Sequence, residues 1–437
     1  MAEIREKSYS LGHRWRSSQF FVLATIAIAL FAETFLYGYL VPILNFMLMN
    51  RLQSDPSHAQ ELISTVLGVY GVLGVVTGPI IGHLADKSPD RKMPLLISLS
   101  LCIVGTCLVA GAHTIHILIF GRVMQGIAGS AVWIIGFATV ADNMSPDRVG
   151  FGMGLMLSFA NSGTISGPVI SGLLLEATGY WATWSVPILV LTVDLIARVV
   201  MIEPPPKALP SPNIASTGFS PLEISGEEQD GLSEENSFWR IILFDGRVVT
   251  CLLITGMSVT VTGSFEATLP LYVQENFGWG SSTVGMLFSG LVIPGLIIGP
   301  LAGWVRDRIG ARIPAVFGAI LQATVLIAMG QLRNKAICIT SIIAIGTLRP
   351  FVSGIAPAEL TAAAKAHQER TPGIFGTNGG TSRVIAMLDV ASSLGLSIGP
   401  LLGGVLKALI GFKYMTWAWG LSYLIIAFSA NRYFLSK

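Results

Sequence analysis

Long apolar blocks separated by short polar connections run through almost the whole chain. Each block reaches the roughly 20 residues that an α-helix needs to cross the hydrocarbon core of a bilayer, about 30 Å thick. The pattern therefore predicts twelve transmembrane helices, at residues 20–48, 61–85, 94–112, 115–141, 149–175, 182–202, 246–273, 282–305, 313–331, 336–359, 381–409 and 413–435.

One long polar segment, residues 203–245, interrupts the apolar blocks. It contains "PPPKALPSPNIASTG" and "GEEQDGLSEEN", which are rich in Pro, Ser and acidic residues and offer little that could form a core. Such a composition is typical of a flexible linker. The segment is predicted to join two halves of six spans each, 20–202 and 246–437, after a short N-terminal tail at 1–19.

Composition agrees with an integral membrane protein. Hydrophobic residues make up 52% of the chain and charged residues only 12%, about half the charged fraction of a typical soluble protein. The first apolar run is far longer than the 7–15-residue core of a signal peptide, so it is predicted to be a retained span. All four cysteines fall within apolar blocks and show no disulfide or metal-ligand spacing.

The distribution of Lys and Arg predicts the orientation of the chain. Of these 27 residues, we count 19 on the side that holds both termini and four within spans, which leaves four on the opposite side: Arg51, Arg333, Lys335 and Lys413. Positive residues accumulate on the cytoplasmic side of membrane proteins. Both termini are therefore predicted to be cytosolic.

The two halves repeat each other. "GVVTGPIIGHLADKSPDR" at 74–91 matches "GLIIGPLAGWVRDRIGAR" at 295–312, so that Gly74 falls on Gly295 and Asp86 on Asp307. In a second pair, "SGPVISGLLLEATGY" at 166–180 matches "IGPLLGGVLKALIGF" at 398–412. Parallel repeats of six spans, with a binding site near the membrane midplane between them, are typical of secondary transporters.

The first repeat also predicts a gate. In each copy, glycines at every fourth position line one helix face, and an acidic residue followed by basic residues comes at the predicted cytosolic end. We expect these charges to pair across the two halves in one conformation and to separate in the other. Plain tight packing without switching is the alternative for the glycines. The candidate residues are Gly78, Gly82, Asp86, Arg91, Lys92, Asp307 and Arg312.

Three motifs resemble those of the major facilitator superfamily. "GHLADKSPDRK" is similar to its signature between spans two and three, with Pro89 and Asp90 replacing a Gly and an Arg. "GRVMQGIAGSAVW" resembles the span-four motif whose arginine, here Arg122, is linked to proton coupling. "GTISGPVISG" resembles the span-five antiporter motif, with Ser171 replacing a Gly. The resemblance implies an all-α fold of two six-helix bundles, with hinge or packing residues at Gly163, Gly167, Pro168 and Gly172 and, in the second half, at Gly399 and Pro400.

Further segments resemble the vesicular amine transporter branch of drug–proton antiporters. "FAETFLYGYLVPIL", "GSFEATLPLYV" and "IAMLDVASSLGLSIGP" place Glu33, Glu266 and Asp389 at acidic positions of that branch. The branch's basic residue in span two is absent, and Tyr70 stands near that position, while its last-span acid is replaced by Ser422. Arg349 in span ten has no counterpart in the branch.

Carboxylates in the middle of membrane spans are costly and indicate function. Burial raises the pKa of a carboxyl group and an approaching cation lowers it, so such a group can bind either a proton or a cationic substrate. We interpret five residues as the coupling and substrate set: Glu33, Arg122, Glu266, Asp389 and Arg349. Because the separation of Glu33 and Glu266 along the chain is close to that of the first repeat, the two are expected to face each other across the pseudo-twofold axis. The alternative for each acid is an ion pair with Arg122 or Arg349.

Asp194 and Arg198 stand one helical turn apart in span six, and a local ion pair is the favoured interpretation there.

The sequence thus favours a proton-coupled antiporter that exports or sequesters small amphipathic organic compounds, such as drugs, amines or secondary metabolites, and not an enzyme. No phosphate-binding loop ending in Gly-Lys-Ser/Thr is present, so the proton gradient, without a cofactor, is the expected energy source. Expected partners are the substrate, protons and the bilayer, with no nucleic acid, for a monomer in the plasma membrane. Two alternatives stay open: a symporter or uniporter that imports a nutrient, and a non-transporting membrane sensor.

Overall fold

The computed structural model describes residues 13–52, 59–88, 90–202, 238–279, 281–331, 334–370 and 380–435, which are almost entirely helical. Pro89, the tail at 1–12 and most of the predicted linker lie outside the described residues. The helices of the N-terminal half are α1 (His13–Arg16), α2 (Gln19–Phe46) with a π-helical turn at Met47–Arg51, α3 (Ala59–Lys87), α4 (Lys92–Ala110), α5 (Ile115–Asn143), α6 (Val149–Thr178), α7 (Tyr180–Thr183) and α8 (Ser185–Val200).

The C-terminal half repeats this order of long helices. It contains α10 (Gly246–Phe277), α11 (Ser281–Ile309), α12 (Arg312–Met329), α13 (Lys335–Val352), α14 (Ala356–Arg370) and α15 (Thr381–Tyr433). The last of these is two helices joined at Gly411, whose φ of 79° interrupts the helical backbone. Glycine adopts this left-handed conformation without the steric penalty of a side chain.

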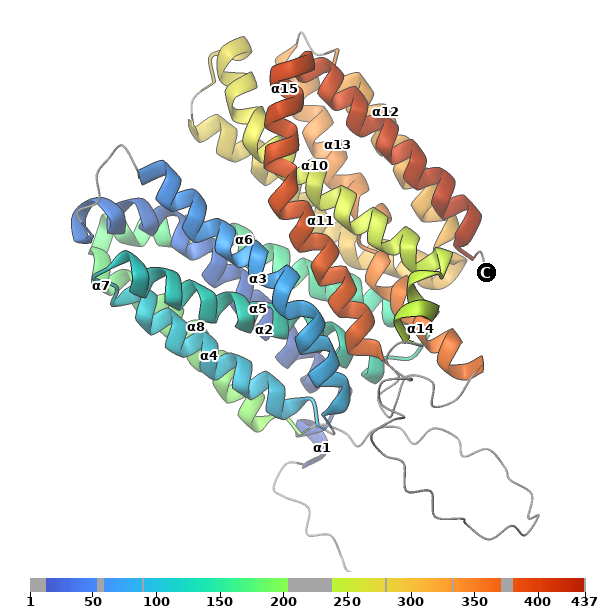
Figure 1. Ribbon diagram of the computed structural model, residues 1–437, viewed down its shortest axis with the longest axis horizontal. Coiled ribbons are helices and arrows are strands. Elements are labelled where there is room, and N and C mark those ends of the chain that lie inside the picture. Colours follow the sequence, from blue (N-terminus) through green and yellow to red (C-terminus); the bar gives the residue numbers. More distant parts are fainter. Residues whose placement is uncertain are drawn as a thin grey trace, which may run out of the picture.

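Twelve membrane-length helices are present in the described residues, as predicted. Ten segments are long and apolar enough to cross a membrane, and one of them, Thr381–Tyr433, holds the two helices that meet at Gly411. The twelfth helix, α6, has 30 residues but is rich in Gly and Ser, which lowers its hydropathy. Figure 1 shows the helices gathered into two bundles that lie side by side, one from each half of the chain.

The polar segment ends earlier than expected. Residues 238–243 are helical, and Phe238 and Ile242 are fully buried in the core of the C-terminal half. The expectation of a linker up to residue 245 is therefore wrong for this part, because two apolar residues four apart give a short helix one buried face.

Both ends of the described chain lie on one side of the bundles, which we call the terminus side. The Ile202 amide donates to the Arg16 carbonyl, and the Arg312 amide donates to the Leu435 carbonyl. The side that holds the connection between α2 and α3 is the far side. The two bundles approach each other most closely near α14, on the terminus side, and diverge towards the far side (Figure 1).

The halves meet along two helix pairs, α3 with α15 and α6 with α11. A Cβ atom on Gly82 would lie 2.7 Å from the Ala386 Cβ and 3.0 Å from the Ser382 carbonyl oxygen. On the other pair, a Cβ on Gly303 would lie 2.0 Å from the Gly150 carbonyl oxygen. The glycine faces predicted from the repeat are therefore the surfaces on which the halves touch. Glycine at these positions permits backbone approach that any other residue would prevent.

Replacing Gly303 by Ala is expected to open the terminus side. The added methyl group has no room against Gly150, and overpacking of this kind costs about 1–3 kcal/mol, so the contact should become roughly 5- to 100-fold less populated. The measurement is the rate at which a cysteine at Ser158, introduced into a cysteine-free background, reacts with a maleimide supplied from the terminus side. Gly285→Ala, on the same helix with no atom within 4 Å of the new methyl, is the matched control. Equal rates in both variants would contradict a closed contact at Gly303.

The glycines and prolines expected to form a hinge pack inside each half. In the N-terminal half, a Cβ on Gly167 would lie 2.5 Å from the Phe35 carbonyl oxygen, and one on Gly163 would lie 2.5 Å from the Phe31 carbonyl oxygen. Pro168 lies against Gly38. These contacts tie α6 to α2, so a bulky residue at Gly167 should disturb the packing of its own half before it affects motion between halves. No atom lies within 4 Å of a Cβ on Gly172, so close packing there is not found.

The second half repeats this packing. A Cβ on Gly399 would lie 2.5 Å from the Thr260 carbonyl oxygen, and Pro400 lies against Gly263. Because Gly399 corresponds to Gly167 and Pro400 to Pro168, Thr260 takes the place of Phe35 and Gly263 that of Gly38. The matches of Phe35 with Thr260 and of Gly38 with Gly263 give the same residue-by-residue correspondence between α2 and α10. In that register, the position in α10 that matches Glu33 is Ser258.

Candidate functional site

Glu33 lies in the middle of α2 with its carboxylate held by two donors. Its side chain is only 8% exposed. The Tyr70 hydroxyl of α3 donates to Oε1, and the Trp133 indole Nε1–H of α5 donates to Oε2 over 3.2 Å. Both oxygens of a carboxyl group deep in the membrane thus have partners, and all three residues belong to the N-terminal half.

Arg122, on α5, is a buried cation beside this carboxylate but not in contact with it. Its side chain is 1% exposed, Nη1 donates to the Gln125 side chain over 2.9 Å, and Nε donates to the Val66 carbonyl over 3.3 Å. The guanidinium lies 5.5 Å from the ring centres of both Tyr37 and Tyr70, a distance suited to cation–π attraction.

No ion pair within 4.0 Å joins Arg122 to Glu33, although the two interact electrostatically. The alternative of a direct structural pair is therefore not found. Among the described residues, Nη2 of Arg122 has no hydrogen-bond partner. Buried polar groups are nearly always hydrogen bonded, so a guanidinium with one unused donor marks a candidate functional group.

Asp389 brings a carboxyl group from the C-terminal half to this cluster. It lies on α15 where that helix crosses α3, with its side chain near Gly78 and close to the Ser130 hydroxyl of α5. It interacts electrostatically with Glu33 and Tyr70. Its Oδ2 atom is buried and lacks a partner within the described chain. Two carboxyl groups, one from each half, therefore lie within electrostatic range of each other, with Asp389 at the contact between the halves.

Glu266 does not occupy the position symmetric to Glu33. In the register set by the packed glycines and prolines, Ser258 does, and its hydroxyl shares a hydrogen bond of 3.1 Å with Tyr423. Glu266 lies eight residues further along α10, about 12 Å nearer the far side at 1.5 Å per residue. The expectation that the two glutamates face each other across the pseudo-twofold axis is thus wrong, because it used the separation along the sequence instead of the packing of these two helices.

Glu266 and Arg349 are accessible, in contrast to the buried cluster. Glu266 is exposed and Arg349 on α13 is half-buried. The two interact electrostatically, and Glu266 also interacts with Tyr37 of the other half. Within the described residues, they make no ion pair with each other inside 4.0 Å. The direct pair considered from the sequence is therefore not formed.

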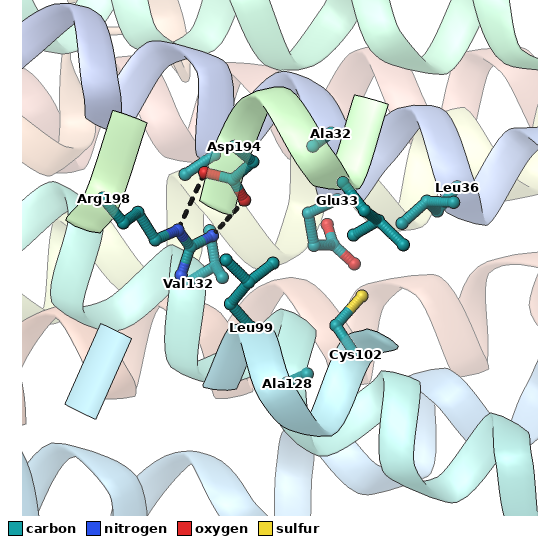
Figure 2. A pocket seen from close by; sticks show the side chains of 11 residues that line it. Ala32, Glu33, Leu36, Leu99, Cys102, Ala128, Val132, Asp194 and Arg198 are labelled. Atoms are coloured by element: carbon teal, nitrogen blue, oxygen red, sulfur yellow. Dashed lines mark hydrogen bonds and ion pairs between the residues drawn. The ribbon is translucent and has the colours of Figure 1, made fainter. Parts of the chain in front are cut away.

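Asp194 and Arg198 form the local pair expected from their spacing. Arg198 Nε and Nη2 donate to the two Asp194 oxygens over 2.8 and 2.6 Å, and the side chains are 1% and 2% exposed. A small cavity of about 10 Å³ lies between this pair, Glu33 and Cys102; Figure 2 shows the arrangement. A second cavity of similar size separates Glu33 from Arg122 and Gln125. Each has room for about one water molecule.

Two carboxylates close the terminus side by capping helices of the opposite half. Asp86 of α3 accepts from the Ser382 and Arg383 amides at the start of α15, over 2.9 and 3.0 Å. Asp307 of α11 accepts from the Gly150 and Phe151 amides at the start of α6, over 2.9 and 2.8 Å. A carboxylate at a helix N-terminus is favoured by the free amides and by the helix dipole. The charges predicted to join the halves therefore do so, with helix ends as their principal partners.

The basic members of the predicted gate differ in their roles. Arg91 donates to Ser382 of the other half and to Asp142 of its own, each over 2.6 Å. Lys92 donates to the Val199 and Met201 carbonyls, which ties α4 to the end of α8 within the N-terminal half. These two bonds of Lys92 stay within one half, whereas the sequence predicted a partner in the other half.

Arg312 also stabilises its own half. Its side chain donates to Asn431 over 3.1 Å, so the expectation that it forms part of the interface is wrong. Arg306 instead supports Asp307, the carboxylate that does cross to the other half: it is 8% exposed and bonds to Asp307 and to Glu359, each over 3.0 Å, within the C-terminal half. Glu359 of α14 also pairs with Arg247.

Sequence reasoning missed Tyr70 and Trp133 as partners of Glu33, and Arg306 and Glu359 as members of the terminus-side network. For Tyr70 a signal existed, since it stands near the position where the vesicular branch carries a basic residue. For Glu359 the sequence offered no such signal, because the residues of α14 were predicted to be the end of a membrane span followed by a loop.

Comparisons with known proteins agree with this architecture. The sequence pattern of the Major Facilitator Superfamily matches residues 26–387. An MFS-type transporter of Schizosaccharomyces pombe is 32% identical over 91% of this chain and 92% of its own length. The multidrug resistance protein MdtG of Proteus mirabilis is 27% identical over 78% of each chain. The vesicular acetylcholine transporter of Drosophila melanogaster is 20% identical over 94% of this chain and 70% of its own.

Among solved structures, the human organic anion transporter MFSD10 superposes with a TM-score of 0.72 and 18% identity, over 94% of this chain and 99% of that one. At this identity the likeness concerns the fold alone. The two bundles, the site between them and the family match define a membrane transporter.

The chain belongs to the major facilitator superfamily. It is a multi-pass integral membrane protein and a transporter, not an enzyme, and its relatives include proteins named as a multidrug resistance protein and a vesicular acetylcholine transporter.

Proposed function

We propose that this transporter is a proton-coupled antiporter that exports or sequesters small amphipathic organic compounds by alternating access. The observation that carries the proposal is that Asp389, a carboxyl group of the C-terminal half at the contact between the bundles, interacts electrostatically with the buried Glu33 of the N-terminal half. A carboxyl group placed there can take up a proton in one conformation and release it in the other, because opening the contact changes its surroundings.

The closed terminus side supports the same proposal. If that side is cytosolic, as the distribution of Lys and Arg predicts, the halves are joined on the cytosolic side in this conformation, through Asp86 and Asp307. Relatives named as a multidrug resistance protein and a vesicular acetylcholine transporter favour export or sequestration. The plasma membrane is the proposed location, and the monomer contains both halves of the site.

The test is transport by the purified full-length protein in vesicles with an imposed pH gradient. The compounds are labelled amphipathic cations, zwitterions, anions and neutral molecules. An antiporter concentrates its substrate on the acidic side, and a proton–potassium exchanger that dissipates the gradient should remove this accumulation. Accumulation on the alkaline side would instead establish a symporter. Equilibration without accumulation would establish a uniporter, and no movement of any compound would favour a sensor.

A further inference from the structure

Glu266 and Arg349 are charged side chains of the membrane-spanning region that stay accessible and unpaired. At 1.5 Å per residue, Glu266 lies about 17 Å from the far-side end of α10 and Arg349 about 21 Å from that of α13, so both lie within membrane-spanning helices and away from the far side. In the described part of the chain, neither side chain makes a hydrogen bond or an ion pair within 4.0 Å. Ionisable groups at this depth normally pair or face an aqueous cavity.

The other guanidinium groups of the spans differ from Arg349 in this respect. Arg198 is 2% exposed and saturated by Asp194, the Leu95 carbonyl and Ser98. Arg122 is 1% exposed and lies between two tyrosine rings. Arg349 is half-buried and its side chain makes no hydrogen bond or ion pair within the described chain, so its guanidinium stays available to a ligand.

The acidic groups divide in the same way. Glu33 is 8% exposed and its two oxygens are used by Tyr70 and Trp133. Glu266 is exposed and interacts electrostatically both with Arg349 of its own half and with Tyr37 of the other half. Exposure together with electrostatic interaction across the halves places Glu266 on the side of α10 nearer the other half. The buried cluster and the accessible pair thus differ in exposure and in hydrogen bonding, although Tyr37 interacts electrostatically with both.

We propose that Glu266 and Arg349 recognise the substrate, and that the substrate class is amphipathic zwitterions, with the cationic group at Glu266 and a carboxylate at Arg349. The inference rests on the proposed transport function. The planar guanidinium matches a carboxylate through two parallel hydrogen bonds. A simple cation would leave Arg349 without a partner and would be repelled by its charge. A simple anion would likewise leave Glu266 without a partner and be repelled by it. The pair therefore selects for a molecule that carries both charges.

Two dyes that share one fluorophore test this inference by direct binding. Rhodamine 110 carries a free carboxylate beside its cationic ring system, and rhodamine 123 is its methyl ester and a cation. We expect the wild-type protein to bind rhodamine 110 more tightly. Arg349→Gln should weaken rhodamine 110 by roughly ten- to hundredfold, the effect of losing a charged hydrogen-bond partner, with little effect on rhodamine 123.

Three further measurements complete the design. Arg349→Lys, which keeps the charge, should retain the preference for rhodamine 110 in part. Glu266→Gln should weaken both dyes, since both carry the cation. Thermal unfolding in detergent verifies that each variant is folded.

The outcomes separate the substrate class from the transport mechanism. Equal weakening of both dyes by Arg349→Gln, or no change in either, would overturn the zwitterion assignment, as would wild-type protein that transports other compounds but binds neither dye. If the dyes bind with the expected charge dependence yet fail to accumulate on the acidic side of vesicles, the substrate class stands and proton-driven antiport fails. If rhodamine 123 accumulates on the acidic side equally well in wild-type protein and in Arg349→Gln, proton-driven antiport stands and the zwitterion assignment fails.

Discussion

Glu33→Gln is expected to abolish pH-driven accumulation of substrate while leaving downhill exchange in place. Glutamine keeps the size of the side chain but cannot bind or release a proton. Its geometry also fits the site: Trp133 can only donate, so it would retain the amide oxygen, and the Tyr70 hydroxyl can accept from the new amide group. The variant should therefore fold normally and bind substrate. The loss should be confined to the coupled proton, so accumulation falls to simple equilibration.

The measurement is substrate-induced proton release from purified protein, followed together with uphill and downhill transport in vesicles. Glu266→Gln is the matched control, since it makes the same chemical change at an accessible position. We expect that variant to bind substrate more weakly and still release protons once substrate is bound. Unchanged release by Glu33→Gln would show that the protons travel elsewhere, and Asp389 would then be the next group to substitute.

Much of the fold follows from the sequence because the bilayer imposes it. Each span must be about 20 apolar residues long and must satisfy its backbone internally, so block length alone predicts the helices. The repeat predicts the contact between halves for a related reason. Glycines at every fourth position, followed by a carboxylate, need another helix close by, and both Asp86 and its repeat partner Asp307 find one in the opposite half.

The position of Glu266 relative to Glu33 could not be predicted from the sequence. Asp86 corresponds to Asp307 in the first repeat, Gly38 to Gly263 in the packing of α2 and α10, and Gly167 to Gly399 in that of α6 and α15. These three pairs are separated by different lengths of chain, because insertions in loops shift one helix pair relative to the next. The number of residues between the two copies of one motif therefore cannot be used to match side chains in a different pair of helices. An error of eight positions moves a side chain by about two turns, or about 12 Å.

Partners across helices are also hidden from the sequence. Helix periodicity indicates which face of α3 is apolar, but not that Tyr70 points at Glu33 or that Arg122 lies between Tyr37 and Tyr70. Those contacts depend on how far neighbouring helices slide and rotate against each other.

Replacing Asp86 and Asp307 together by Asn should produce the largest shift between conformations. Each carboxylate accepts two backbone amides of the opposite half, and hydrogen bonds to a charged group contribute about 1.5–3 kcal/mol each. Asn keeps one acceptor oxygen but loses the charge and the second acceptor. Each single variant should therefore open the terminus side by roughly ten- to hundredfold. The double variant should combine the two effects, since the sites share no partner.

A cysteine at Ala386, introduced into a cysteine-free background, reports this opening through its reaction rate with an impermeant maleimide. Ala386 is 1% exposed and packs against Gly82 in the closed contact, so it should react only when the halves separate. Glu275→Gln is the matched control, because its ion pair with Lys407 lies on the far side. Transport turnover should fall more than substrate affinity, since the closed state is lost while the binding residues are intact. Protection of Ala386→Cys that persists in the double variant would mean that glycine packing alone holds the halves together, and that the repeated carboxylates do not form a gate.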